Sequence, residues 1–350
     1  MSKNHWVMDY ETLVDCTVLV AEHYTGTEVK TFSISRLSNQ FAELIEFLEQ
    51  CKKQGEWHIS FNGLGFDSQI SEHILRAKSY LRGLTGGEIA NWIYTRAQKI
   101  IEGQDQNRFA EFSEKDLSIR QIDVFKLNHW DNAAKRSGLK WIQYSMDWPN
   151  LLDMPIEHYQ SITTQEQLDT IIEYCKNDVK STKQIMHLSK EQINLRKTLT
   201  EEYKINLFSA SEPRISKELF LHFLSEETGI SKYNLRSLKT RRDLIKIADI
   251  ILPYTNFKTL TFQSLLHNFK SLILDARNTK GGFKYNITHK GVRTDFGLGG
   301  VHGCTESGVY QGGNGMIIMS SDVVSYYPNL AIRNKWAPAH LPKEEFCRRY

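Results

Sequence analysis

The sequence predicts an α/β fold built on a mixed sheet, and three observations favour this class. Strand-type runs of apolar and β-branched residues fill the N-terminal part as far as residue 34. A run with helical spacing and a further apolar strand follow, so strands and helix can share one core. Acidic residues stand at the ends of several of these elements, where such a sheet gathers a functional site.

The first predicted strand carries Asp9 and Glu11 at the end of its apolar run. Residues i and i+2 of a strand point to the same face, so these two carboxylates are expected to project together. Like charges held this close repel each other unless a cation lies between them, and hard oxygen ligands suit Mg²⁺ or Mn²⁺. The pair therefore predicts a divalent cation site.

Two further strands and a helix come next. Residues 17–22 and 28–34 predict antiparallel strands separated by the turn at Gly26. We expect Ser38 to cap the following helix. The apolar residues of that helix keep spacings of 3, 4 and 7: Phe41, Leu44, Ile45 and Leu48.

Two acidic residues follow in different contexts. The strand expected over 57–61 enters a glycine-punctuated turn, after which Asp67 stands at a helix N-cap. Residues 79–115, rich in Gly, Gln and charge, are expected to be an excursion on the core. Residues 120–125 predict another strand, in which we expect Asp123 to be a structural carboxylate and not a metal ligand.

A long helix is predicted from Thr164, which opens a capping pattern with Gln167, towards Leu195. Tyr174 and Asp178 are an i, i+4 pair on it and share one helix face. Hydrolysis of a phosphodiester by two metal ions needs several carboxylates to hold the ions ~3.5 to 4 Å apart, with a further group to orient the attacking water. The first need is met by four residues: Asp9, Glu11, Asp67 and Asp178. Tyr174 meets the second.

These motifs, in this order, resemble the Exo I, Exo II and Exo III motifs of the 3′-5′ proofreading exonuclease domain of family B DNA polymerases. The resemblance implies a ribonuclease H-like exonuclease domain over residues 1–195, with two Mg²⁺ (or Mn²⁺) ions held by the four carboxylates. By motif match, Thr12, Asn62 and Phe66 would grip the last bases of a single-stranded DNA 3′ end.

Residues 322–328 resemble the palm motif A of the same family, and we expect a strand over 316–321 to deliver Asp322. The resemblance implies that Asp322 and the Val323 carbonyl bind the metals of nucleotide transfer, and that Tyr327 packs under the sugar and excludes a 2′-hydroxyl. Gly299 and Gly300 partly match a template-binding Tyr-x-Gly-Gly loop of protein-primed phage polymerases, with Gly297 in place of the Tyr.

The fingers motif and the second palm motif of the family are missing from the sequence. We therefore expect residues 196–350 to be an incomplete α+β palm region, and the chain to be the N-terminal part of a viral or phage DNA polymerase, as a fragment or one half of a split enzyme. The partners implied are a primer–template duplex, a second polymerase subunit or a terminal protein, and deoxynucleoside triphosphates only with the missing portion. The early first motif is similar to the protein-primed group.

Charge is distributed unevenly over the 350 residues, which are enough for two domains. Residues 1–190 contain 21 Lys and Arg against 26 Asp and Glu, a net charge of −5, whereas residues 191–300 contain 18 against 11, a net charge of +7. A basic run lies in this second part: Lys232, Arg236, Lys239, Arg241, Arg242 and Lys246. This run is either a solvated helix face or a phosphate contact. Lys140 is likewise either a surface lysine or a phosphate-neutralising one.

The targeting and redox features of the sequence predict a cytoplasmic protein, which would lie in the host cytoplasm if the source is viral. No apolar run approaches the roughly 20 residues of a membrane span, and the start lacks a signal-peptide core. Five widely spaced cysteines, without a Cys-x-x-Cys pair, argue against a disulfide framework and a zinc ribbon: Cys16, Cys51, Cys175, Cys304 and Cys347.

Two other functions remain open at this point. The chain could be a free-standing 3′-5′ exonuclease that kept a polymerase remnant, or a non-catalytic scaffold that binds nucleic acid. All four carboxylates are present, which counts against the scaffold.

Overall fold

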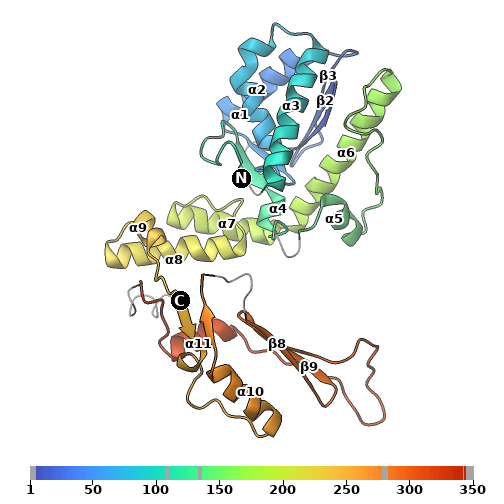
Figure 1. Ribbon diagram of the computed structural model, residues 1–350. Coiled ribbons are helices and arrows are strands. Elements are labelled where there is room, and N and C mark those ends of the chain that lie inside the picture. The colour runs from blue at the N-terminus through green and yellow to red at the C-terminus, as the bar shows by residue number, and fades with distance from the viewer. Residues whose placement is uncertain (1–4, 107–109, 133–135, 278–282, 342, 344–350) are drawn as a thin grey trace. The chain divides into compact units, whose positions relative to one another are not determined.

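The structure, a computed structural model, describes residues 5–106, 110–132, 136–277, 283–341 and 343 (Figure 1). The chain divides into two compact units, Met1–Leu219 and Phe220–Tyr350. The domain boundary expected after residue 195 stays a prediction. Cys347, one of the five cysteines of the sequence, lies outside the described residues.

A five-stranded mixed sheet forms the centre of the first unit, with the strand order β3-β2-β1-β4-β5. The strands are β1 (His5–Leu13), β2 (Cys16–His23), β3 (Val29–Ser35), β4 (Trp57–Ser60) and β5 (Arg120–Asp123). The pairs β1–β2 and β2–β3 are antiparallel, whereas β1–β4 and β4–β5 are parallel. This confirms a mixed α/β fold, and it is consistent with the ribonuclease H-like domain expected.

Helices cover both faces of this sheet, because alternate residues of β1 enter two separate cores. Met8 and Tyr10 pack against one face, under α1 (Phe41–Gln54), α2 (Asp67–Leu81) and α3 (Gly86–Asp105). Val7 packs against the other face, under α4 (Val124–Leu127), α5 (Leu139–Ser145) and α6 (Gln165–Leu188). Figure 1 shows α1, α2 and α3 side by side on their face of the sheet.

Two expectations for the first face were wrong. The N-cap of α1 is Gln40, not Ser38, because the Ser38 hydroxyl is taken up by the turn after β3 and accepts a hydrogen bond of 2.7 Å from Ser33 Oγ. Most of the excursion expected over 79–115 is the long helix α3. Thr85 and Glu88 form a capping box at its start.

The capping box at Thr164 is confirmed as the start of α6. This helix ends at Leu188, and α7 (Lys190–Tyr203) continues the helical path after the single residue Ser189. Arg196 of α7 is fully buried and donates three hydrogen bonds of 2.9 Å to backbone carbonyls of Leu127, Gln192 and Ala210. The Arg196 guanidinium thereby holds α7 against the end of α4.

The boundary between the two units lies within α8 (Glu212–Thr228), so the second unit begins with the C-terminal half of this helix. It contains helices α9 (Lys232–Ser237), η1 (Ile247–Asp249), α10 (Leu260–Lys270) and α11 (Tyr326–Arg333), and strands β6 (Leu244–Lys246), β7 (Ile273–Asp275), β8 (Lys284–His289), β9 (Val292–Gly297) and β10 (Gly300–Cys304). The strands form an antiparallel β8-β9-β10 sheet and a β6-β7 pair. The basic run therefore spans α9, a loop and β6, and is not one helix face.

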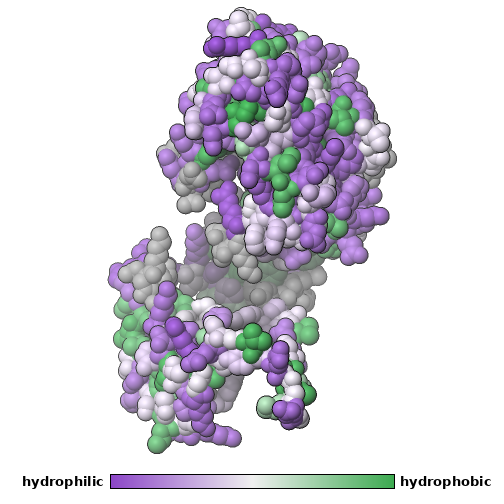
Figure 2. Space-filling view, turned by 90° about the vertical axis from the view of Figure 1, so that its right-hand side faces the viewer, coloured by the Kyte–Doolittle hydropathy of each residue, from purple (hydrophilic) through white to green (hydrophobic). Residues whose placement is uncertain are grey.

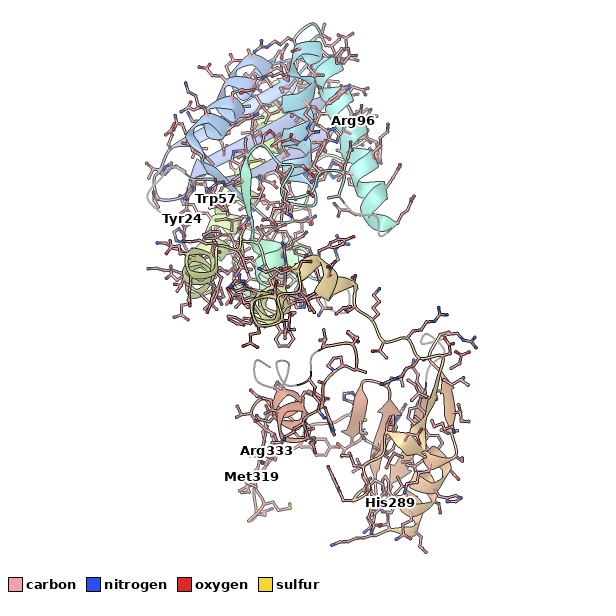
Figure 3. The ribbon with its side chains drawn as sticks, turned by 90° about the vertical axis from the view of Figure 1, so that its left-hand side faces the viewer. Tyr24, Trp57, Arg96, His289, Met319 and Arg333 are labelled. Carbon is pink, nitrogen blue, oxygen red and sulfur yellow. The ribbon has the colours of Figure 1, made fainter. Side chains whose placement is uncertain are left out.

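The strand expected over 316–321 does not form. Apart from an isolated bridge between Gly313 and Met316, this stretch is irregular, because no described strand pairs with it. Its apolar side chains are exposed: Met316, Ile317, Ile318 and Met319. Figure 3 labels Met319 of this stretch, in the second unit.

The visible face of the first unit in Figure 2 is mainly hydrophilic, with scattered hydrophobic residues. Within the described ranges, the helices are too short or too polar to cross a membrane.

Candidate functional site

Three elements of the first unit bring the four predicted carboxylates to one pocket of about 320 Å³. Asp9 and Glu11 come from β1, Asp67 from the first turn of α2, and Asp178 from α6. Each of these four lines the pocket, together with Phe61, Asn62, Phe66, Phe125, Arg136, Ser137, Gly138 and Leu139. Residues that are up to 169 positions apart in the chain therefore share one solvent-accessible recess.

The turn before Asp67 is fixed by its own backbone geometry. Asn62 has φ of 61°, in the left-handed region that an Asn tolerates better than most residues. A Cβ atom on Gly63 would lie 1.7 Å from Ser60 Oγ, so a larger residue there would have to displace the buried Ser60 side chain. These two positions turn the chain from β4 towards the start of α2.

Asp123 holds the same turn from β5 and is completely buried. Its carboxylate oxygens accept hydrogen bonds from the backbone N–H groups of Asn62 at 3.0 Å, Leu64 at 3.1 Å and Phe125 at 3.1 Å. Burial nevertheless raises its pKa to about 6. These contacts are those of the structural carboxylate that we expected, and Asp123 does not line the pocket.

Asp67 is joined directly to β1. Its Oδ1 accepts a hydrogen bond of 3.1 Å from the backbone N–H of Tyr10, the residue between Asp9 and Glu11. This bond fixes the start of α2 against the strand that carries the other two carboxylates.

Asp178 and Tyr174 lie one turn apart on α6, close enough for the charge of Asp178 to act on the Tyr174 phenol. Gln143 of α5 donates from Nε2 to Asp178 Oδ1 at 2.8 Å and to Ser181 Oγ at 2.8 Å. Burial, followed by the charge of Asp178, raises the pKa of Tyr174 far above its usual range. The phenol therefore keeps its proton at neutral pH and can donate a hydrogen bond.

Burial and mutual repulsion make the ionised carboxylates costly. Burial, then the charges of its neighbours, raises the pKa of Asp9 well above its usual range and that of Glu11 to about 8. Burial also raises the pKa of Asp67 to about 7 and, by a lesser amount, the pKa of Asp178. A divalent cation would relieve this repulsion and favour the ionised forms.

The donor atoms fit such a cation. Ligand atoms of Asp9, Glu11 and Cys175 lie within 4.8 Å of one another, and Asp67 and Asp178 border the same pocket. Carboxylate oxygens are ligands for Mg²⁺ or Mn²⁺. Cys175 instead makes a hydrogen bond to the backbone of Asp9. Its thiol, whose pKa is raised by burial, donates to the Asp9 carbonyl at an Sγ–O distance of 3.3 Å.

Sequence reasoning missed three residues at this site. Gln143 and Cys175 carry no motif, and only the fold brings them to Asp178 and Asp9. Arg136 is exposed and lines the pocket.

Lys140, singled out from the sequence, lies beside the site. Its Nζ is 6.0 Å from the centroid of the Tyr174 ring and 2.6 Å from Asp153 Oδ1. Its charge lowers the pKa of Glu11 and of Asp178, although burial outweighs this effect at both carboxyls.

Thr12 differs from the other predicted residues of this site. It follows Glu11 on β1, so its side chain points to the opposite face of the strand. It is buried and is not among the residues that line the pocket. Its contact with a base stays a prediction that the motif alone carries.

The predicted palm residues lie in the second unit. Asp322 and Val323 are exposed, and Asp322 Oδ1 accepts only a local bond of 2.8 Å from the Val323 backbone N–H. Within the described ranges, Asp322 belongs to no cluster of potential metal ligands. Gly299 and Gly300 lie at the β9–β10 turn, and a Cβ on Gly300 would lie 3.6 Å from the Tyr327 hydroxyl. The roles of these residues stay predictions.

A protein-family model described as "Predicted 3'-5' exonuclease related to the exonuclease domain of PolB" matches residues 5–216. No curated protein matches the chain.

Proposed function

The chain belongs to this family of predicted 3′-5′ exonucleases related to the exonuclease domain of PolB, and from this premise we propose that it removes nucleotides from the 3′ end of single-stranded DNA. The observation that carries the proposal is the convergence of Asp9, Glu11, Asp67 and Asp178 on one pocket. Four carboxylates with raised pKa values in one recess are costly for the fold, and cation binding gives them a use.

In this proposal the four carboxylates hold two Mg²⁺ or Mn²⁺ ions. When bound, such a pair lowers the pKa of a water molecule and neutralises charge on the phosphodiester. Gln143 fixes one oxygen of Asp178, which leaves the other oxygen for the pocket. The backbone bond from Tyr10 fixes Asp67 in the same way.

Tyr174 orients the attacking water through its hydroxyl, since a phenol with a raised pKa donates a hydrogen bond but does not act as a base at neutral pH. Asn62 and Phe66, which line the pocket, contact the terminal bases. Arg136 and Lys140 supply positive charge at the edge of an otherwise acidic recess, where the phosphates of the strand enter.

The test uses a single-stranded oligonucleotide labelled at its 5′ end and Mg²⁺. The parent is expected to give a ladder of products that shorten from the 3′ end. Asp9→Ala with Glu11→Ala should abolish the ladder, because too few ligands remain for the metal pair. Glu43→Ala with Glu46→Ala, which removes two exposed carboxylates of α1, is the matched control and should act as the parent does. Shortening at the parental rate by the first double variant would show that the site is assigned wrongly.

A further inference from the structure

A second cleft, of about 670 Å³, lies beside α3 and contains none of the four carboxylates. Its walls come from the second half of α2, the first half of α3, and the turn that joins β1 to β2. Three cations line it: Arg36, Arg96 and Lys99. Figure 3 shows Arg96 on α3.

The cations of this cleft have no carboxylate of their own. In the part of the chain that the structure describes, Arg36, Arg96 and Lys99 form no salt bridge. The two acidic residues of the cleft are engaged with backbone N–H groups: Asp15 accepts from Ile162 at 3.0 Å, and Glu88 accepts from Thr85 at 2.8 Å. The three cations and two carboxylates together give the lining a net charge of +1 (3 − 2), and among the described residues the cations are the groups left without a hydrogen-bonded ion partner.

Aromatic side chains lie among these cations. Tyr80 is 62% exposed, and Trp92 is half-buried with the Arg96 guanidinium 5.1 Å from its ring centroid. Grooves that bind single strands without sequence preference combine cations for the phosphates with aromatic faces on which bases stack. This cleft has both kinds of side chain.

Two hydrogen bonds join α3, which forms a wall of the cleft, to the two segments that carry Glu11 and Asp67. Asn91 donates to the Val14 carbonyl at 3.0 Å, and Val14 follows Glu11 by three residues of a strand, about 10 Å. At the other end, Gln104 donates at 2.8 Å to the carbonyl of Gly65, in the turn that carries Asp67. The helix between these two contacts spans about 20 Å. A DNA single strand whose 3′ end lies at the carboxylates therefore needs several more nucleotides to reach the cleft.

We propose that this cleft is an accessory binding site for single-stranded DNA, which holds about three phosphates on Arg36, Arg96 and Lys99 and stacks a base on Tyr80 or Trp92. The inference rests on the proposed exonuclease function for its choice of ligand. It adds a prediction that the pocket alone does not make: affinity depends on strand length.

The test measures fluorescence anisotropy of labelled oligothymidylates of 4 and 16 nucleotides in EDTA, where hydrolysis cannot proceed. The cleft variant is Arg36→Ala with Arg96→Ala and Lys99→Ala. The control is Lys52→Ala with Lys53→Ala and Arg82→Ala, which removes three cations elsewhere on the same unit. Thermal melts of both variants establish that they are folded.

We expect the cleft variant to bind the 16-mer about tenfold or more weakly, with a salt dependence reduced by about 2 in the slope of log K against log salt. The 4-mer should bind as it does to the parent, and the control variant should bind both strands as the parent does. Tyr80→Leu should weaken binding of the 16-mer by about 5- to 150-fold, the range for loss of one stacked base.

Equal affinity of the cleft and control variants for the 16-mer would overturn the proposal. Failure of the proposed function would look different: the parent would shorten no oligonucleotide in Mg²⁺, whatever the binding measured in EDTA.

Discussion

The side-chain amide of Gln143 donates a hydrogen bond of 2.8 Å to Asp178 Oδ1, across 35 positions of sequence. Gln143 is completely buried, and its Oε1 atom has no hydrogen-bond partner. Burial of an amide oxygen without a hydrogen-bond partner costs free energy, so the bonds that Gln143 Nε2 donates must offset this cost. We therefore regard Gln143 as a residue that positions Asp178 for cation binding.

The first prediction follows from this contact. Gln143→Met keeps the volume and removes the donor, which frees the Asp178 carboxylate to rotate and raises its pKa further. Loss of such an outer partner typically costs about 10- to 100-fold in metal affinity or activity. The Mg²⁺ concentration for half-maximal rate should rise, and the pH profile should move to higher pH.

The matched control for Gln143 is Ser181→Ala. It removes the second acceptor of the same amide group but leaves the bond to Asp178. A parental Mg²⁺ requirement in Gln143→Met, or an equal rise in both variants, would reduce Gln143 to a packing residue.

The second prediction concerns Tyr174. Tyr174→Phe keeps the ring and removes one hydrogen bond, worth about 0.5 to 3 kcal/mol according to the charge of its partner. The single-turnover rate on one oligonucleotide should fall by roughly 3- to 150-fold, whereas Asp178→Ala should fall further. A Phe variant as fast as the parent would leave Tyr174 as an aromatic of the core.

The third prediction is a dependence of stability on pH in the metal-free protein. The unfolded chain loses its carboxyl protons above about pH 4 to 5, whereas folded Asp67 and Glu11 keep theirs up to about pH 7 and about pH 8. The folded state binds more protons in this window, so the free energy of unfolding should fall as pH rises through it.

Denaturant titrations from pH 6 to pH 9 in EDTA would measure this slope. Glu11→Gln with Asp67→Asn should flatten it, because neither amide titrates. Mg²⁺ should stabilise the parent most at the alkaline end, since it binds the ionised folded site. A metal-free parent whose stability is flat or rises over this range would contradict the electrostatic account.

The fourth prediction separates Asp123 from the cation ligands. Asp123→Asn replaces one acceptor oxygen by an NH₂ group, so a buried backbone N–H of the Asn62 turn or of Phe125 loses its partner at a cost of about 1 to 3 kcal/mol. The melting temperature should fall by about 2 to 10 °C. The Mg²⁺ requirement of the folded fraction should not change. Asp67→Asn should instead raise the Mg²⁺ requirement without lowering the melting temperature. Loss of activity by Asp123→Asn at parental stability would make Asp123 a ligand.

Local patterns predicted most of the first unit. The β1, β2 and β4 strands follow from short apolar runs, and α6 from the capping box at Thr164, because each signal lies within the element itself. The four carboxylates were found because a motif carries each one. Gln143 carries none, since its role arises only when α5 packs on α6.

The prediction failed in two places for different reasons. Residues 79–115 were interpreted as an excursion because they are rich in Gly, Gln and charge, although the capping box of Thr85 and Glu88 and the apolar residues of the buried face of α3 were local signals for a helix. The strand expected over 316–321 was wrong because a strand requires a neighbour, and the described part of the chain supplies none.

That unpaired stretch has a consequence for the behaviour of the protein at high concentration. Residues 315–321 contain four exposed apolar side chains, no charge and no proline, and Met319 is 79% exposed. Segments of six or seven residues with this composition pair edge to edge between copies and seed aggregation. Asp322 stands directly after the segment, where a charge acts as a gatekeeper against such stacking. By this rule, the charge of Asp322 should oppose pairing of the segment between copies of the chain.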